Sequence, residues 1–248
     1  MKCNDKILIA GVVAIAMLST SPTVAGKFKY NTVNVSNGGT IKGIVTKSGK
    51  TPKDEFKTVT ANKTQCGAKI AAEKYVISSK GEVKWAVAML KGISEGKKLD
   101  TKSKTTLDNS GCRFEPHVLV APAKGNFEVK NSDPMLHNSH FYLVKKSGAK
   151  KNVINLALPK KGQTIAKSKI LRKAGLLSVE CDAHDFMQGY IWSVPHPYAE
   201  VTNDKGGFTM TDVPPGTYTL RVWHEALGEK TASVTVAAGK TSNVKVVF

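Results

Sequence analysis

Arginine and cysteine are scarce in this chain, and a long apolar run occurs only near its start. Arg113, Arg172 and Arg221 are the three arginines among 37 basic residues, so the excess over 19 acidic residues comes from lysine. Recognition of bases and phosphates relies on the guanidinium fork, whereas lysine surfaces are solvated or steer charged partners. Nucleic-acid binding is therefore not expected. Four cysteines in 248 residues are also too few for a small disulfide scaffold.

The motifs of common hydrolases and kinases are missing too. We find no ordered Ser, His and Asp triad, no phosphate loop and no carboxylate pair arranged for acid–base catalysis. With 41% hydrophobic and 23% charged residues, the chain can bury a core. The sequence therefore favours a protein that is not an enzyme.

The first 25 residues have the three zones of an export signal. Lys2 and Lys6 form a positive start, residues 7–18 are apolar, and small residues lead to a cleavage site near Ala25. The apolar run of about 12 residues is shorter than the roughly 20 that span a bilayer. We expect a periplasmic or otherwise exported protein, and a retained membrane anchor is the alternative.

Cleavage at this site changes both the charge and the cysteine count. The formal charge falls from +18 to +17, because Lys2 and Lys6 are lost together with Asp5. Three cysteines remain in a compartment that oxidises thiols, and an odd number leaves one to pair between chains, stay free or bind a metal.

Short alternating runs bounded by glycine and proline recur along the rest of the chain. Residues 83–90, 141–144, 190–194 and 217–223 are examples, and helical spacing is scarce. This pattern is typical of β-sandwiches and barrels, so we predict an all-β protein.

Two segments place metal ligands directly after predicted strands. Cys181, His184 and Met187 are spaced three residues apart, and His137 follows the predicted strand at 126–130. Two imidazoles, a thiolate and a weak axial thioether are the donors of blue-copper electron-transfer sites, whereas zinc rarely takes a thioether. A buried structural role is the alternative for any one of these residues. Four ligands at this spacing favour a metal site.

These segments, MLHNSHF and VECDAHDFMQGYIWSV, resemble the copper-binding segments of the cupredoxins of the amicyanin and plastocyanin type. The resemblance implies a Greek-key β-sandwich at residues 80–195. It also implies copper as the cofactor, with His137, Cys181 and His184 as equatorial ligands and Met187 as the axial ligand.

The same resemblance implies roles around the metal. Asn138 is expected to brace the two ligand loops through hydrogen bonds. His184 is expected to be the exit for the electron, because the second histidine lies nearest the surface in this family. Asp182 and Asp185 depart from the family pattern, since they put carboxylates beside an edge that is apolar in cupredoxins.

Residues 196–248 resemble a second family, the carboxypeptidase regulatory-like (transthyretin-like) β module. The turn DKGGF and the segment VPPGTYTL carry this likeness, and residues 39–52 look like the start of a similar module. The expected division is a leader at 1–25, an N-terminal β segment at 26–79, the copper domain at 80–195 and the module. A copper domain inserted between two parts of one module is the alternative.

With Cys181 assigned to copper, Cys66 and Cys112 remain. The simple interpretation is a disulfide that staples the N-terminal segment to the copper domain, and two separate thiols are the alternative. The other histidines are each expected to be surface or satisfied core residues: His117, His140, His196 and His224. A second metal site drawn from His117, His196 and His224 is the alternative.

The expected function is electron transfer by an exported type 1 copper protein. An acidic redox partner, a cytochrome or a dehydrogenase, fits the lysine-rich charge, as does an anionic envelope surface. A role in solubility is the alternative for this charge. The second functional hypothesis is a copper carrier or storage protein without a redox role. The third is a structural β-sandwich for adhesion or carbohydrate binding.

Overall fold

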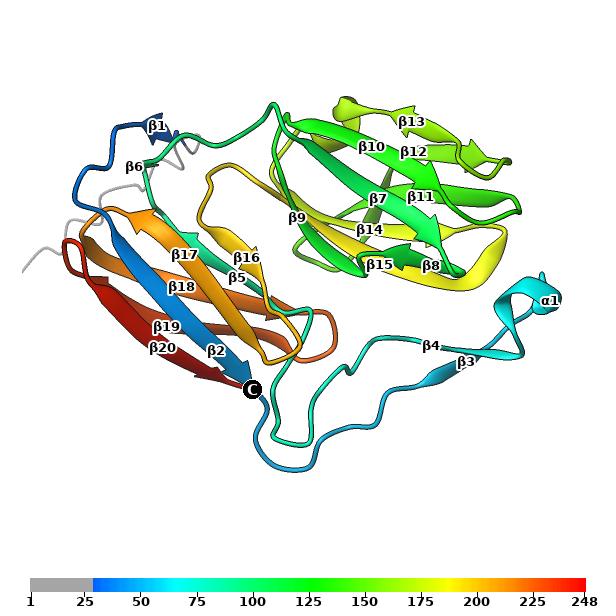
Figure 1. The fold of residues 1–248 in the computed structure, drawn as a ribbon, viewed down its shortest axis with the longest axis horizontal. Helices are drawn as coiled ribbons and strands as arrows, with labels where there is room; N and C mark the ends of the chain where they lie inside the picture. Colours follow the sequence, from blue (N-terminus) through cyan, green and yellow to red (C-terminus); the bar gives the residue numbers. More distant parts are fainter. Residues whose placement is uncertain (1–28) are drawn as a thin grey trace, which may run out of the picture.

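Strands make up nearly all the regular structure in residues 29–248, the part of the chain that the computed structural model describes. The all-β prediction is confirmed. The strands form two β-sandwiches that lie side by side, with one extended arm beneath them (Figure 1). The predicted leader lies outside the described residues. Among residues 29–248, no helix has the length and apolar character needed to cross a bilayer.

The middle sandwich is built from the centre of the chain. Its five-stranded sheet has the order β12-β11-β14-β15-β9, and its four-stranded sheet has the order β13-β10-β7-β8. The bounds are β7 (Lys104–Ser110), β8 (Arg113–Glu115), β9 (Val118–Pro122), β10 (Asn126–Asn131), β11 (His137–Val144), β12 (Lys150–Leu158), β13 (Thr164–Ala166), β14 (Gly175–Cys181) and β15 (His184–Val194), with a 3-10 turn η1 (Ser168–Leu171). Alternate side chains of both sheets point inward, as in Phe127 of β10 and Phe141 of β11, whose rings meet edge to face.

The flanking sandwich takes its strands from both sides of the middle sandwich in sequence. Its sheets have the orders β16-β5-β18-β19 and β17-β2-β20. The bounds are β2 (Gly39–Thr46), β5 (Val87–Lys91), β16 (Ala199–Val201), β17 (Gly207–Val213), β18 (Gly216–His224), β19 (Gly228–Val236) and β20 (Thr241–Val247). β2 pairs in parallel with β20, and β5 pairs antiparallel with β18. β5 thus belongs to this sandwich, although the boundary drawn from the sequence at residue 80 assigns it to the copper domain. An apolar run suits either sheet, so local pattern could not place it.

A third apolar cluster joins the two sandwiches. It includes Trp192 of β15 and Trp223 of β18, whose ring centroids lie 5.7 Å apart. Beside it, the imidazole of His117 contacts the carboxylate of Glu225, and both side chains are buried. This seam holds the two sandwiches against each other through apolar burial and a buried polar pair.

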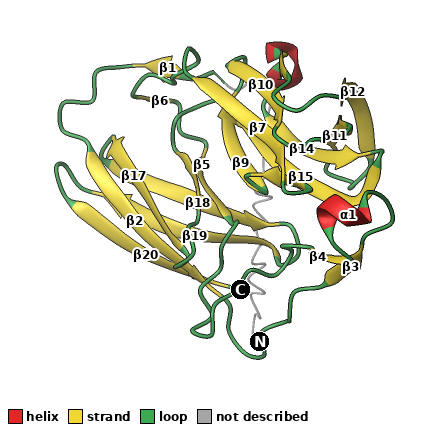
Figure 2. Ribbon diagram, turned by 45° about the vertical axis from the view of Figure 1, so that its right-hand side comes forward, coloured by secondary structure: helices red, strands yellow, loops and turns green. Residues whose placement is uncertain are grey.

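The remaining elements are short. β1 (Asn31–Thr32) pairs with β6 (Glu95–Gly96) near the top of Figure 1. Residues 56–71, here called the arm, contain β3 (Phe56–Thr58), helix α1 (Lys63–Cys66) and β4 (Lys69–Ala71). The arm leaves the flanking sandwich and reaches one end of the middle sandwich, where α1 lies near the turn that joins β14 and β15 (Figures 1 and 2).

Candidate metal centre

Three predicted ligands meet at one end of the five-stranded sheet. His137 begins β11, Cys181 ends β14, and His184 begins β15. β14 is hydrogen-bonded to both of the other strands, and Cys181 pairs in register with His184 across the turn that joins β14 to β15. Strand pairing therefore brings together side chains that are 44 positions apart in the sequence.

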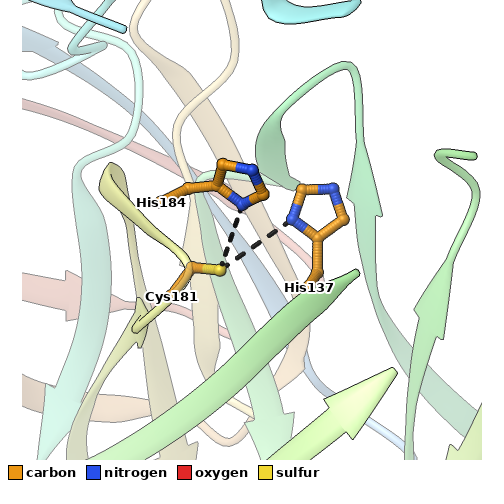
Figure 3. A group of neighbouring side chains, drawn as sticks. All are labelled: His137, Cys181 and His184. Carbon is orange, nitrogen blue, oxygen red and sulfur yellow. Dashed lines mark hydrogen bonds between the residues drawn. The ribbon is translucent and has the colours of Figure 1, made fainter. Parts of the chain in front are cut away.

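The three side chains point toward one another (Figure 3). Sγ of Cys181 lies 3.9 Å from Nδ1 of His137 and 3.5 Å from Nδ1 of His184. One ligand atom from each residue lies within 4.8 Å of the others. A sulfur and two imidazole nitrogens at this separation can hold one soft metal ion between them.

The ligands are shielded from water, which sets their protonation. Both imidazoles are 0% exposed and Cys181 is 3% exposed. Burial lowers the pKa of His137, although Asp133 opposes this shift, and burial also lowers the pKa of His184. Burial raises the pKa of the Cys181 thiol. Neutral imidazoles are ready to bind metal, while the thiol must lose its proton when the metal enters.

The outer nitrogen of His137 is held by Asp133. Nε2 lies 3.0 Å from Oδ2 of Asp133, and since a carboxylate only accepts, Nε2 carries the proton. The lone pair of Nδ1 then faces Cys181. Asp133 also accepts the backbone N–H groups of Gly111 and Cys112 at 2.8 and 2.9 Å. Such an outer carboxylate orients a ligand histidine and fixes its tautomer.

The outer nitrogen of His184 is held by Asn62 of the arm. Nε2 donates to Oδ1 of Asn62 at 2.8 Å. Neither ligand imidazole is exposed, since His137 and His184 are both 0% exposed, and Asn62 lies between His184 and the surface. The role of His184 as the exit for the electron stays a prediction.

Asn138 braces the site through its backbone. Its N–H donates to Sγ of Cys181 at 3.3 Å, which links the two ligand segments as predicted. Its side-chain amide donates instead to Asn155 at 3.4 Å, and Asn155 in turn donates to Asp182 at 2.6 Å. The side chain thus reaches the ligand turn only through a neighbour on β12.

Met187 lies three residues beyond His184 on β15. It is 3% exposed and belongs to the same apolar cluster as Cys181 and Phe186. Its assignment as the axial ligand stays a prediction. The donor set around it, one buried thiol and two oriented imidazoles, fits copper.

The cysteine assignments follow the simple interpretation. Cys66 and Cys112 form a disulfide with a Cα–Cα distance of 5.7 Å, and Cys181 is a free, buried thiol. The disulfide joins α1 of the arm to the turn between β7 and β8.

The remaining histidines form no second cluster in residues 29–248, where only His137, Cys181 and His184 bring their ligand atoms close enough together to share a metal ion. His140 stacks on Tyr142 at 4.2 Å and contacts Asp182. His117 contacts Glu225 at the seam. Burial lowers the pKa of His196 and that of His224 to about 4. Each is a satisfied or buried structural histidine.

Sequence reasoning missed Asp133 and Asn62. Asp133 had a usable signal, since it stands four residues before His137. Asn62 had none, because it is 122 positions away from the ring that it holds.

Comparison with known proteins identifies a family for the C-terminal region. Residues 196–248 match the family of carboxypeptidase regulatory-like domains. The middle of the chain is cupredoxin-like in its two-sheet sandwich with a His, Cys and His cluster at one end. No curated protein sequence matches the chain at a significant level.

Three similar solved structures are distant in sequence, and each covers less than half of this chain. Amicyanin from Paracoccus versutus is 17% identical over 37% of this chain and 82% of amicyanin, with a TM-score of 0.31. A purple cupredoxin from Nitrosopumilus maritimus is 16% identical over 38% of this chain and all of its own (100%), with a TM-score of 0.28. A copper-containing nitrite reductase from Thermus scotoductus is 21% identical over 41% of this chain and 24% of the reductase, with a TM-score of 0.30.

Proposed function

We propose that this protein is an exported type 1 copper protein that carries electrons. His137, Cys181 and His184 would be the equatorial ligands and Met187 the axial one. The observation that supports this most is the buried thiol of Cys181 between two imidazoles whose inner nitrogens face it. Bound copper would supply a Cu(I)/Cu(II) couple at this site. Export rests on the leader at residues 1–25.

The protein's own part in this function is to keep the ligands in place. Asp133 fixes the tautomer of His137, and Asn62 does the same for His184. The N–H of Asn138 points at the sulfur and would stabilise the thiolate. Because the ligands sit at the ends of paired strands, they need to move little between two oxidation states.

Charge suggests where an acidic redox partner docks. No Asp or Glu occurs between Asp133 and Glu180. That stretch contains ten basic residues: Lys145, Lys146, Lys150, Lys151, Lys160, Lys161, Lys167, Lys169, Arg172 and Lys173. A field of one sign steers a partner of the opposite sign toward this face.

A hollow of about 280 Å³ lies within this basic region. Its lining includes Leu143 and Leu177 together with four cations, Lys151, Lys169, Arg172 and Lys173. None of the four makes an ion pair with a carboxylate in the part of the chain that the structure describes. Leu177 is four residues from Cys181 on β14, about 14 Å along one strand. We propose this basic hollow as the docking site for an acidic partner.

Copper titration tests the function. Adding Cu(II) to the protein without its leader should produce an intense visible thiolate-to-copper band that saturates at one copper ion per protein. Cys181→Ser should lose that band and keep the fold. A colourless complex, or a band that survives Cys181→Ser, contradicts the proposal. Voltammetry separates the electron carrier from a copper carrier or storage protein, since only the former requires fast, reversible oxidation and reduction.

A further inference from the structure

We propose that Asn62 is a positioning residue for the ligand His184, and that the arm closes the copper site against solvent and direct contact by a partner. This inference rests on the proposed copper site. It concerns a segment that lies outside the middle sandwich and contributes no metal ligand.

The first observation is how Asn62 is held. It has φ 53° and ψ 40°, a left-handed conformation that asparagine and glycine tolerate best. Its carbonyl accepts the N–H groups of Gln65 and Cys66 at 3.0 and 2.9 Å, which fixes its backbone at the start of α1.

The second observation is what its side chain does. An asparagine before a helix commonly uses its side chain to cap the free N–H groups of the first turn. Asn62 makes no such cap. Its amide oxygen instead accepts a hydrogen bond from the Nε2–H of His184. The local helix gives up a cap, and a fully buried imidazole gains its partner.

The third observation is that the arm is fastened to the two residues that follow His184. Thr60 donates to Asp185 at 2.8 Å, and the ammonium of Lys57 donates to the backbone carbonyl of Phe186 at 3.3 Å. Val59 and Ile70 bury their side chains in the core of the middle sandwich, at 0% and 6% exposed. Together these contacts seat the arm over the turn that carries the second histidine.

The disulfide connects the arm to the support of the other histidine. Cys66 belongs to α1, which begins directly after Asn62. Cys112 donates its N–H to Asp133, which accepts from His137. The disulfide therefore links the two supports: Asn62, which holds His184, lies next to the helix of Cys66, and Asp133, which holds His137, is hydrogen-bonded to Cys112. Asn62 itself is exposed, so it is the link between His184 and the surface.

Chemical labelling of the metal-free protein tests this arrangement without copper. Diethyl pyrocarbonate acylates accessible, neutral imidazoles, and mass spectrometry reads each site. In the wild type we expect His184 to react far more slowly than His140. Asn62→Gly keeps the left-handed backbone and removes the amide, so His184 should react about three- to tenfold faster, the factor expected for one lost hydrogen bond. His137, held by Asp133, should keep its rate.

Two further variants separate positioning from general loosening. Asn62→Asp retains an acceptor oxygen and should restore the protection of His184. Lys124→Gly is the matched control, because Lys124 is an exposed residue of the middle sandwich with φ 62°. An unchanged rate in Asn62→Gly, or an equal acceleration in Lys124→Gly, overturns the proposal.

The copper-loaded protein gives a second readout that a purely structural residue would not move. Asn62→Asp puts a negative charge beside a ligand imidazole, which favours Cu(II) and should lower the reduction potential. If the copper-loaded protein is blue but His184 is equally protected with and without Asn62, the role proposed for Asn62 is wrong and the copper site stands. If the protein stays colourless with copper but His184 becomes reactive in Asn62→Gly, the role of Asn62 stands and the proposed function is wrong.

Discussion

Oδ2 of Asp133 lies 3.0 Å from Nε2 of His137, and the same carboxylate accepts the N–H of Cys112. One buried acid thus holds both a proposed metal ligand and a half-cystine. This contact orients the imidazole of His137 at the start of β11. It also makes the stability of the turn at Cys112 depend on a residue beside the site.

Replacing Asp133 should therefore cost stability even in the metal-free protein. In Asp133→Asn, one of the two acceptor oxygens becomes a donor and faces a backbone N–H. We expect a loss of about 1–3 kcal/mol in the free energy of unfolding, measured by urea denaturation. Asp204→Asn is the control, because Asp204 makes an exposed ion pair with Lys84 and should cost less than about 1 kcal/mol. Equal losses in the two variants would contradict this role.

Reduction of the disulfide should destabilise the protein and loosen the arm. The bond joins residues 46 positions apart, which in the chain-entropy view corresponds to roughly 3–4 kcal/mol. Guanidinium unfolding of the metal-free wild type with and without dithiothreitol measures this loss. Cys66→Ser/Cys112→Ser should not respond to the reductant. A change of less than about 1 kcal/mol in the wild type would show that the staple has little effect on folding.

Buried histidines should make the metal-free protein less stable in mild acid. Burial lowers the pKa of His224 to about 4, with Glu225 opposing the shift and His117 adding to it. The unfolded chain therefore binds this proton near pH 6.5, before the folded protein does. The contribution is fully present above about pH 6.5 and is lost as the pH falls toward 4.

A substitution isolates this contribution. His224 accepts the N–H groups of Ala226 and Leu227 at its Nδ1, and an asparagine oxygen at that position can do the same without titrating. Between pH 6.5 and 4, the free energy of unfolding should therefore fall less in His224→Asn than in the wild type, because one titrating group is missing. The same pH dependence in both proteins would show that His224 does not contribute.

Charge reversal in the basic hollow should slow reaction with anionic oxidants. Lys169→Glu/Lys173→Glu is expected to lower the rate at which ferricyanide oxidises the Cu(I) protein, and to weaken the salt dependence of that rate. Lys230→Glu/Lys240→Glu changes the net charge equally on the flanking sandwich. Stopped-flow rates that fall equally in both variants would reject the hollow as the docking site.

Sequence reasoning succeeded where the signal was local. Cys181 and His184 fall within four consecutive residues of one strand-turn-strand unit, and the structure brings their side chains together. Once Cys181 was assigned to the metal, only Cys66 and Cys112 remained to form the disulfide. His137 reaches Cys181 because it begins the strand that pairs with β14.

The failures were all non-local. β5 pairs with β18 of the C-terminal region, and its apolar run carries no mark of this partner. The pairing of β2 with β20 fits the alternative in which the copper domain is inserted between two parts of one module. The exposure of His184 depends on an arm that precedes it by more than 100 residues, so no pattern around His184 could reveal that it is covered. The family resemblance could not show this cover, because it describes the middle sandwich and says nothing about a segment laid over it.

The most direct test of the copper assignment is the electron paramagnetic resonance spectrum of the Cu(II)-loaded protein. In a short, covalent bond to the Cys181 thiolate, unpaired spin moves onto sulfur and narrows the copper hyperfine splitting. We predict a narrow splitting together with the visible band, both lost in Cys181→Ser. A wide splitting of the kind given by nitrogen and oxygen ligands, unchanged by Cys181→Ser, would contradict the account.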